Sequence, residues 1–198
     1  MDPYRTAEVR WFRPGEVPAA VRAWFDALGP EVEPESRTDR YLAPTSAALG
    51  VKVREGQLEA KRRDGTGAAL TAGRSEAPVE AWAKWSFALA VPDALAEDAG
   101  EPGDGWIGVE KTRWQRHAGA CALELSRLRL DGGEPWWSVC LEATGPDPDA
   151  RRAALAGAAR QWLGADGAPA LPASEAQGYP AWLLARQADG GAPGSSAS

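Results

Sequence analysis

Charged side chains recur at every second position in several short segments of this chain, and this spacing has chemical consequences. Lys52 and Arg54 alternate with valines, and Lys111 and Arg113 stand two residues apart. Alternate side chains of a β-strand point to the same face, so each pair shares one face. If such faces enclose a space, their buried charges call for pairing or for an ionic ligand such as a polyanion. Further charged residues with this spacing are Glu59, Lys61, Lys84, Glu124 and Glu142.

The composition excludes several other kinds of chemistry. With His117 as the single histidine and Cys121 and Cys140 as the two cysteines, the chain offers no zinc-binding pattern and no Ser-His-Asp or Cys-His arrangement. The two thiols are expected to be free, as in a reducing cytoplasm. A net charge of −6 argues against a broad nucleic-acid-binding surface. Apolar runs are too short for a membrane span, and no signal peptide is evident, so we predict a cytoplasmic protein.

The segments that must position these charges have the period of β-strands. Alternation and turn residues predict a hairpin through Glu55-Gly56 and a second one through Gly132-Gly133. The chain of 198 residues suits one domain, which we place at residues 1–187. The predicted strands cover residues 8–12, 37–42, 51–54, 58–63, 82–89, 109–114, 121–130 and 136–144.

Helices are fewer. One is predicted over residues 17–28, a second from Asp147 as N-cap to Gly164, and a short third over residues 174–184. Pro180 suggests that this last helix begins nearer Gly178. Residues 92–105 are predicted to be a loop, with a hint of helix at 94–99, and residues 188–198 a disordered tail.

About eight strands with few helices predict an α+β fold, mainly antiparallel, in which an eight-stranded closed or nearly closed barrel is flanked by helices. The alternation leaves two arrangements open. In the first arrangement, the charged strand faces lie in water around an apolar interior. In the second, the helices cover the apolar strand faces from outside, and the charged faces line a tunnel.

In order and spacing the chain resembles the CYTH family, the triphosphate tunnel metalloenzymes, from about residue 8 to 183. The family opens with Glu-x-Glu-x-Lys, and this chain has Glu8-Val9-Arg10-Trp11-Phe12. The family's Asp-x-Tyr segment is similar to Asp39-Arg40-Tyr41. Its paired-glutamate strand is similar to the segment that ends in Glu142, and its C-terminal motif is similar to the segment that begins with Gly178-Tyr179. The resemblance implies a tunnel with triphosphate-binding basic residues and with Mg or Mn held by glutamates. The implied phosphate-binding residues are Arg10, Lys52, Arg54, Lys61, Lys84, Lys111 and Arg113, and the implied metal ligands are Glu8, Glu124 and Glu142.

Three positions depart from the family pattern. Arg10 replaces the second glutamate of the opening motif, Phe12 replaces its lysine, and Cys140 replaces the first glutamate of the later pair. A hard divalent cation does not favour a thiol, so the implied metal site loses part of its ligand set. Each remaining glutamate could equally be an ion-pair partner for Lys or Arg, and each basic residue could lie on the surface.

Three functions follow from these alternatives. The first is metal-dependent hydrolysis of a triphosphate or other organic phosphate, with no catalytic residue assigned. The second is a binding module that holds a phosphorylated or acidic small molecule in a basic tunnel. The third is a non-catalytic barrel that binds an apolar or aromatic molecule through some of its ten tryptophans. The sequence slightly favours binding, or binding with a very weak metal-dependent phosphatase activity, and leaves the oligomeric state open.

Overall fold

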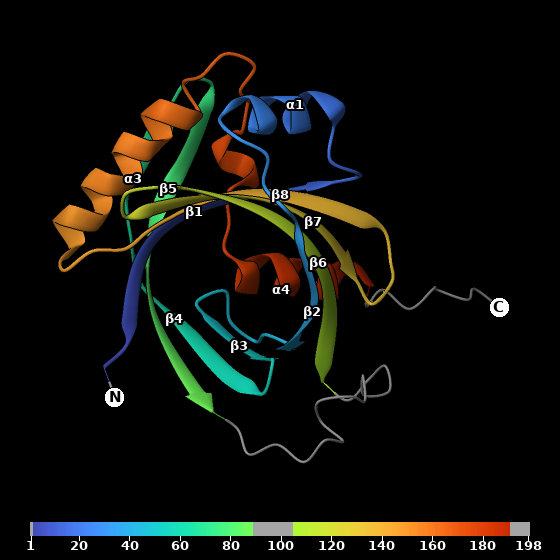
Figure 1. The fold of residues 1–198 in the computed structure, drawn as a ribbon. Coiled ribbons are helices and arrows are strands. Elements are labelled where there is room, and N and C mark those ends of the chain that lie inside the picture. Colours follow the sequence, from blue (N-terminus) through green and yellow to red (C-terminus); the bar gives the residue numbers. More distant parts are fainter. Residues whose placement is uncertain (1, 89–104, 191–198) are drawn as a thin grey trace.

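The computed structural model describes residues 2–88 and 105–190, and its strands close into one antiparallel barrel. The order around the barrel is β1-β5-β4-β3-β2-β6-β7-β8 (Figure 1). The predicted eight-stranded α+β barrel is therefore confirmed. The strands are β1 (Tyr4–Pro14), β2 (Glu35–Leu42), β3 (Leu49–Arg54), β4 (Gln57–Ala72), β5 (Ser75–Ala88), β6 (Trp106–Ala118), β7 (Cys121–Leu130) and β8 (Pro135–Ala143).

Strand β1 closes the barrel by pairing with two strands from distant parts of the chain. Glu8 lies opposite Glu80 of β5 on one side and opposite Glu142 of β8 on the other. Most of the remaining pairs are hairpins between consecutive strands, in the two groups β3-β4-β5 and β6-β7-β8. Strand β2 connects these two groups, because it pairs with β3 on one side and with β6 on the other. Closure gives each strand a partner on both sides over at least part of its length.

Strands β4 and β5 extend well beyond the predicted ranges 58–63 and 82–89. Their ladder shifts register twice between residues 63 and 69, and each irregularity breaks the alternation from which strands are predicted. The two strands meet at Gly73, whose φ is +57°. A Cβ atom there would lie 2.1 Å from the carbonyl oxygen of Leu163, so the turn requires glycine.

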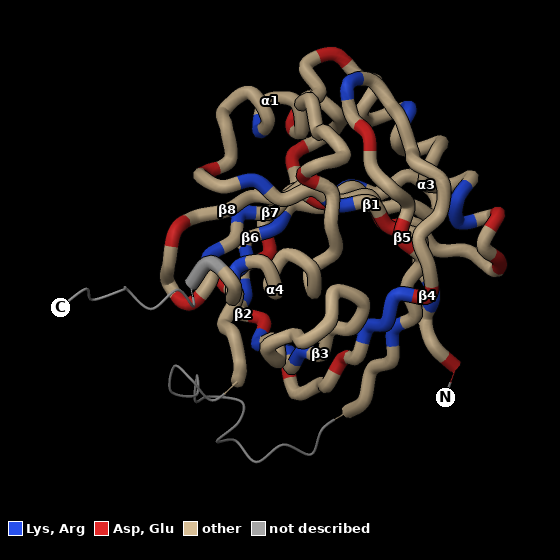
Figure 2. The backbone as a smooth tube through the Cα atoms, turned by 180° about the vertical axis from the view of Figure 1, so that it is seen from behind, with Lys and Arg blue, Asp and Glu red and all other residues tan. Residues whose placement is uncertain are grey.

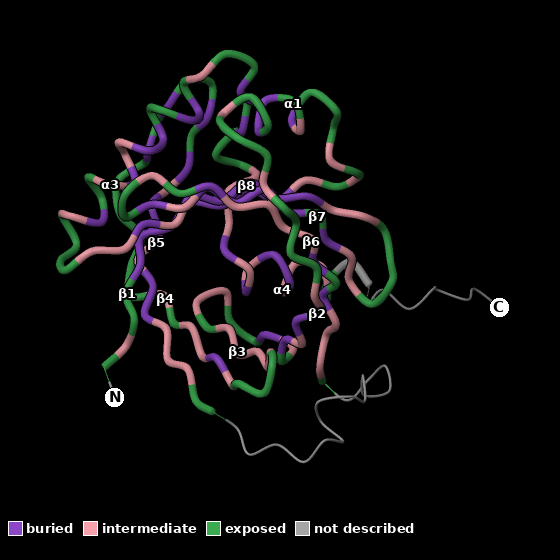
Figure 3. The backbone as a smooth tube through the Cα atoms, in the orientation of Figure 1, coloured by how far each residue is buried: buried purple, intermediate pink, exposed green. Residues whose placement is uncertain are grey.

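Helices α1 (Ala19–Ala27) and α3 (Pro148–Trp162) cover apolar strand faces from outside the barrel (Figures 1 and 3). Trp24 of α1 and Leu155 of α3 join Leu123 and Val139 of the strands in one buried core. The side chain of Asp147 accepts a hydrogen bond of 2.8 Å from Ala150 N, as predicted for the N-cap. Among the described residues, no helix is long and apolar enough to cross a membrane.

Helix α4 (Tyr179–Gly190) lies within the ring of strands and packs on an apolar part of the interior (Figure 1). Phe12 stacks on Trp182 at 4.4 Å between ring centroids. A single helix was predicted over residues 174–184. The structure has a 3₁₀ turn, η1 (Ala173–Glu175), and a separate helix that begins close to Pro180. Because α4 extends to Gly190, residues 188–190 of the predicted tail are helical.

Two predicted regions cannot be compared with the structure. Residues 191–198 lie outside the described residues, and so does nearly all of the predicted loop 92–105 with its hint of helix at 94–99.

Arg116 of β6 connects the C-terminal end of α1 to the barrel through hydrogen bonds. The guanidinium is buried and donates hydrogen bonds to Phe25 O at 2.9 Å and Pro30 O at 2.8 Å. It also reaches Asp26 O at 3.4 Å and Gly29 O at 3.3 Å. Phe25 O and Asp26 O also accept hydrogen bonds from the backbone N–H groups of Leu28 and Gly29, so Arg116 adds a side-chain donor to the carbonyl groups at this helix end.

The Arg116→Met substitution is therefore expected to lower the free energy of unfolding by about 3 kcal/mol, because it removes a buried charged group together with all of these hydrogen bonds. Urea unfolding of both proteins measures the difference. Arg127→Met is the matched control, because Arg127 is exposed on β7. Equal losses for the two variants would contradict the role given to Arg116.

Candidate functional site: a charged tunnel

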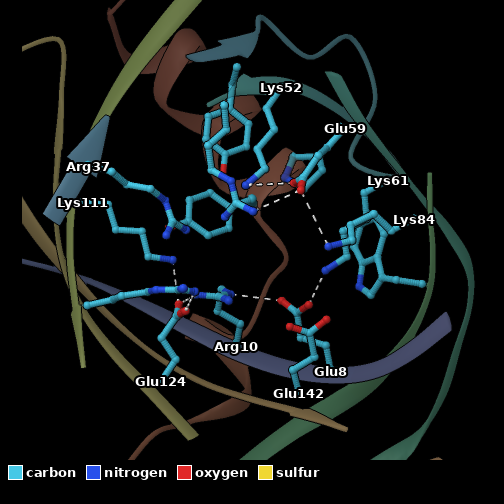
Figure 4. A pocket seen from close by; sticks show the side chains of 17 residues that line it. Glu8, Arg10, Arg37, Lys52, Glu59, Lys61, Lys84, Lys111, Glu124 and Glu142 are labelled. Carbon is cyan, nitrogen blue, oxygen red and sulfur yellow. Dashed lines mark hydrogen bonds and ion pairs between the residues drawn. The ribbon is translucent and has the colours of Figure 1, made fainter. Parts of the chain in front are cut away.

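The barrel encloses a cavity of about 150 Å³ whose wall is largely charged (Figure 4). All seven predicted phosphate-binding residues and all three predicted metal-binding glutamates line it. The charges thus face inward, which decides between the two arrangements that the alternation left open. The lining residues are Glu8, Arg10, Arg37, Tyr41, Gly50, Lys52, Arg54, Glu59, Lys61, Trp82, Lys84, Lys111, Arg113, Glu124, Glu142, Tyr179 and Pro180.

Three cations converge on Glu59 at one wall of the tunnel. Lys52 Nζ lies 3.2 Å from one carboxylate oxygen of Glu59, and Arg54 Nη2 lies 3.3 Å from the other. Lys84 Nζ is 3.8 Å from Glu59. Strands β3, β4 and β5 supply these groups from neighbouring positions of the sheet (Figure 2). Burial would raise the pKa of Glu59, but the three cations outweigh it, led by Lys52, and lower that pKa.

Strand β2 adds a cation that sequence reasoning did not single out. Arg37 donates to Asp39 over 2.9 Å, and Lys52 Nζ lies 3.2 Å from the other oxygen of the same carboxylate. Arg37, Asp39 and Tyr41 alternate along the strand, so the spacing that identified Lys52 and Arg54 could also have identified Arg37. Asp39 is 1% exposed and anchors both cations.

The opposite wall is organised by Arg10. Its Nε atom donates to Glu8 Oε1 at 3.0 Å, and its Nη1 atom donates to Glu124 Oε1 at 2.9 Å. Lys61 also pairs with Glu8. Lys111 Nζ lies 2.8 Å from Glu124. Strands β1, β8 and β7 run side by side here, with Arg10 opposite Cys140 and Cys140 opposite Glu124.

The three glutamates do not form the metal site that the resemblance implied. Among the described residues, no group of three or more His, Cys, Asp or Glu side chains could hold a metal ion. Glu8 and Glu124 are instead both engaged by Arg10, and Cys140 offers no carboxylate between them. Glu142 lies beside Glu8 across the β1–β8 ladder and makes no ion pair within the described part of the chain. The donor set present does not fit Mg or Mn.

Cys140 is also unsuited to act as a nucleophile. The thiol is 1% exposed. Burial raises its pKa well above the ordinary value, although Arg10 opposes this effect. A thiol held in the protonated form is unreactive, so Cys140 is a small buried residue of the wall.

Positive charge exceeds negative charge in the tunnel. Its lining has eight basic and four acidic side chains, an excess of four, although the chain as a whole carries −6. Three carboxylates outside the lining, Asp39, Glu35 and Glu55, pair with cations of the lining and reduce the local excess to one. The lining carboxylates Glu59 and Glu124 are each shared by three cations, so their oxygens cannot satisfy every donor around them.

Tyr179 brings a neutral donor to the same cavity. It is the first residue of α4, and its ring stacks on Tyr41 with centroids 5.3 Å apart. Arg10 lies 4.9 Å from the Tyr179 ring centroid and Lys111 5.5 Å from it. The buried hydroxyl has no hydrogen-bond partner in the described residues. Burial raises the pKa of Tyr179, so this hydroxyl keeps its proton and can donate a hydrogen bond to an anion.

The tryptophans do not make this cavity suitable for an apolar ligand. Of the ten, only Trp82 lines the cavity among the described residues. Trp11, Trp24 and Trp137 are buried in the core beneath the outer helices, and Trp182 packs against Phe12. An aromatic or apolar ligand requires an apolar lumen, which this charged tunnel does not provide.

The fold and the site together define a closed antiparallel barrel with a charged, mainly basic tunnel. No family model matches the chain, and no curated protein matches it. A conserved hypothetical protein from Pyrococcus furiosus is similar in structure, with 13% identity and a TM-score of 0.46 over 82% of this chain and 93% of that one.

A second similar structure is the S. pombe Pct1 RNA triphosphatase in complex with the Spt5 CTD. It has 10% identity and a TM-score of 0.40 over 83% of this chain and 79% of that one. With TM-scores below 0.5, neither likeness assigns the chain to a family.

Proposed function

We propose that the tunnel binds a phosphorylated or similarly polyanionic small molecule. The observation that carries this proposal is the excess of cations over carboxylates inside an enclosed cavity of an acidic protein. Like charges gathered in a confined space repel one another, and an anionic ligand relieves that repulsion. The seven predicted basic residues would serve as its contacts.

The donors in the tunnel suit phosphate oxygens in particular. Arginine presents several N–H groups in a planar fork, lysine presents three, and both form strong charge-assisted hydrogen bonds with phosphate. Lys84 is the most available of these cations, because its nearest carboxylate, Glu59, is 3.8 Å away. A cavity of about 150 Å³ favours a compact ligand over a large organic molecule.

The test is thermal unfolding with tripolyphosphate, compared with sodium sulfate at equal ionic strength. At a concentration of about 100 times Kd, binding stabilises the folded state by about 2.7 kcal/mol. For a domain of this size that corresponds to a rise in Tm of about 5–10 °C. Absence of any shift up to millimolar tripolyphosphate would overturn the proposal.

The same samples test for hydrolysis. Phosphate release is measured with EDTA, with Mg²⁺ and with Mn²⁺. Because the donor set does not fit a metal, we expect binding without appreciable release in any of the three. Turnover that appears only with Mg²⁺ or Mn²⁺ would replace the binding function with that of a metal-dependent phosphohydrolase.

A further inference from the structure

We infer that the tunnel holds its polyanion without a divalent cation, because the guanidinium of Arg10 is a fixed cation between Glu8 and Glu124. This inference rests on the proposed function, since it concerns how the same ligand is held. It assigns Arg10 the central position among the ligand contacts.

The contacts of Arg10 leave no space for a metal between the two carboxylates. Its Nε and Nη1 atoms lie 3.0 Å from Glu8 and 2.9 Å from Glu124. A divalent cation that used both carboxylates would have to displace this guanidinium. Arg10 is 7% exposed and also donates to Ser138 Oγ at 3.3 Å, so displacement would leave a buried charge without its partners.

Aromatic rings hold the guanidinium from a further direction. Arg10 lies 4.9 Å from the centroid of the Tyr179 ring and 5.9 Å from that of Phe12. Both rings belong to the apolar cluster in which α4 packs inside the barrel. The position of Arg10 is thus set by two carboxylates, a hydroxyl and two rings, and a side chain held in this way binds an anion with little further loss of entropy.

Arg10 retains donors for a ligand after these contacts are made. Its Nη2 atom makes no hydrogen bond within the described residues, and the side chain lines the cavity. The unpartnered Tyr179 hydroxyl and the Lys111 ammonium group contribute to the same wall. An oligophosphate oxygen at this wall would therefore meet positive charge and N–H or O–H donors where a metalloenzyme would present a metal ion.

Calorimetric titration with tripolyphosphate, in EDTA and then in excess Mg²⁺ or Mn²⁺, tests the inference. We expect binding in EDTA and no gain in affinity from either metal. Affinity that rises about tenfold or more with metal, equivalent to about 1.4 kcal/mol, would overturn the inference while leaving the proposed function intact. Absence of binding under all conditions would overturn the proposed function itself. Tight stoichiometric binding of Mn²⁺ alone, seen by EPR, would also overturn the inference.

Variants of β1 supply the control. Arg10→Gln is expected to weaken binding in EDTA by about tenfold or more, the usual effect of losing a charged hydrogen-bonding group. Arg13→Gln makes the same change on the same strand. Arg13 lies on the opposite face and pairs with Glu175, so unchanged binding is expected. Equal losses in the two variants would overturn the role of Arg10.

If circular dichroism shows that Arg10→Gln is unfolded, the affinity of Arg10→Lys is compared with that of the original protein instead. It keeps the charge but cannot form the fork that spans Glu8 and Glu124. Weaker binding that is still independent of metal supports the inference, and unchanged affinity overturns it.

Discussion

Replacing Lys84 with glutamate is expected to weaken tripolyphosphate binding by at least about a hundredfold, or about 3 kcal/mol. Lys84 lines the tunnel, and its nearest carboxylate, Glu59, is 3.8 Å away. Its charge is therefore the least compensated of the three cations around Glu59. The substitution removes one positive charge and adds a negative one beside Glu59, so the excess of cations in the tunnel falls by two. Isothermal titration calorimetry measures the change.

Arg62→Glu is the matched control for Lys84→Glu. It changes the net charge by the same amount, but Arg62 belongs to the exposed part of β4 and pairs with Asp64 outside the tunnel. We expect its affinity to remain within about threefold of the original, because exposed charges are screened by salt. Similar losses for both variants would show that only the overall charge matters, and they would contradict binding inside the tunnel.

The second large effect concerns acid stability and Glu8. Burial would raise the pKa of this carboxyl, but Lys61 and Arg10 outweigh it and lower the pKa from 4.5 to about 2. A folded-state pKa below the unfolded one stabilises the fold above about pH 4.5, and this contribution disappears as the pH falls toward 2. The difference between the two pKa values corresponds to about 3 kcal/mol.

Glu8→Gln is therefore expected to lower the free energy of unfolding by about 3 kcal/mol at pH 7, with the loss shrinking toward zero near pH 2. Urea unfolding across this pH range measures both proteins. Glu142→Gln is the control: it faces the same tunnel but makes no ion pair within the described residues, so a small effect is expected at every pH. A deficit for Glu8→Gln that stays constant with pH would contradict the ion-pair explanation.

Alternation in the sequence was sufficient to group the site residues by strand face. Lys52 with Arg54, Lys111 with Arg113, and Glu124 on β7 all line the tunnel as their spacing predicts. Arg37 follows the same rule but was not singled out, whereas Glu59 was grouped with Lys61 by its spacing but was given no role in the site. Tyr179 lies on a helix rather than a strand, so no strand rule could have placed it in the tunnel.

The ion pairs were beyond sequence reasoning. Whether Glu8 binds a metal or pairs with Lys61 depends on the order of the strands around the barrel, in which β5 lies between β1 and the strand β4 that carries Lys61. The contact between Arg10 and Glu124 joins residues 114 positions apart. Local spacing carries no information about such distances, and the resemblance in motifs therefore implied a ligand set that the packed barrel does not form.

The sequence by itself determined the strands, the side chains that share each face, and the apolar stripes of α1 and α3, because these follow from the local period of the backbone. Only the tertiary structure decided that the charged faces point inward. The outer helices bury the apolar faces, and β1 closes the ring, which leaves the Lys, Arg and Glu side chains to meet across the lumen. The convergence of these charged side chains depends on contacts between segments that are distant in the sequence, and no local pattern specifies such contacts.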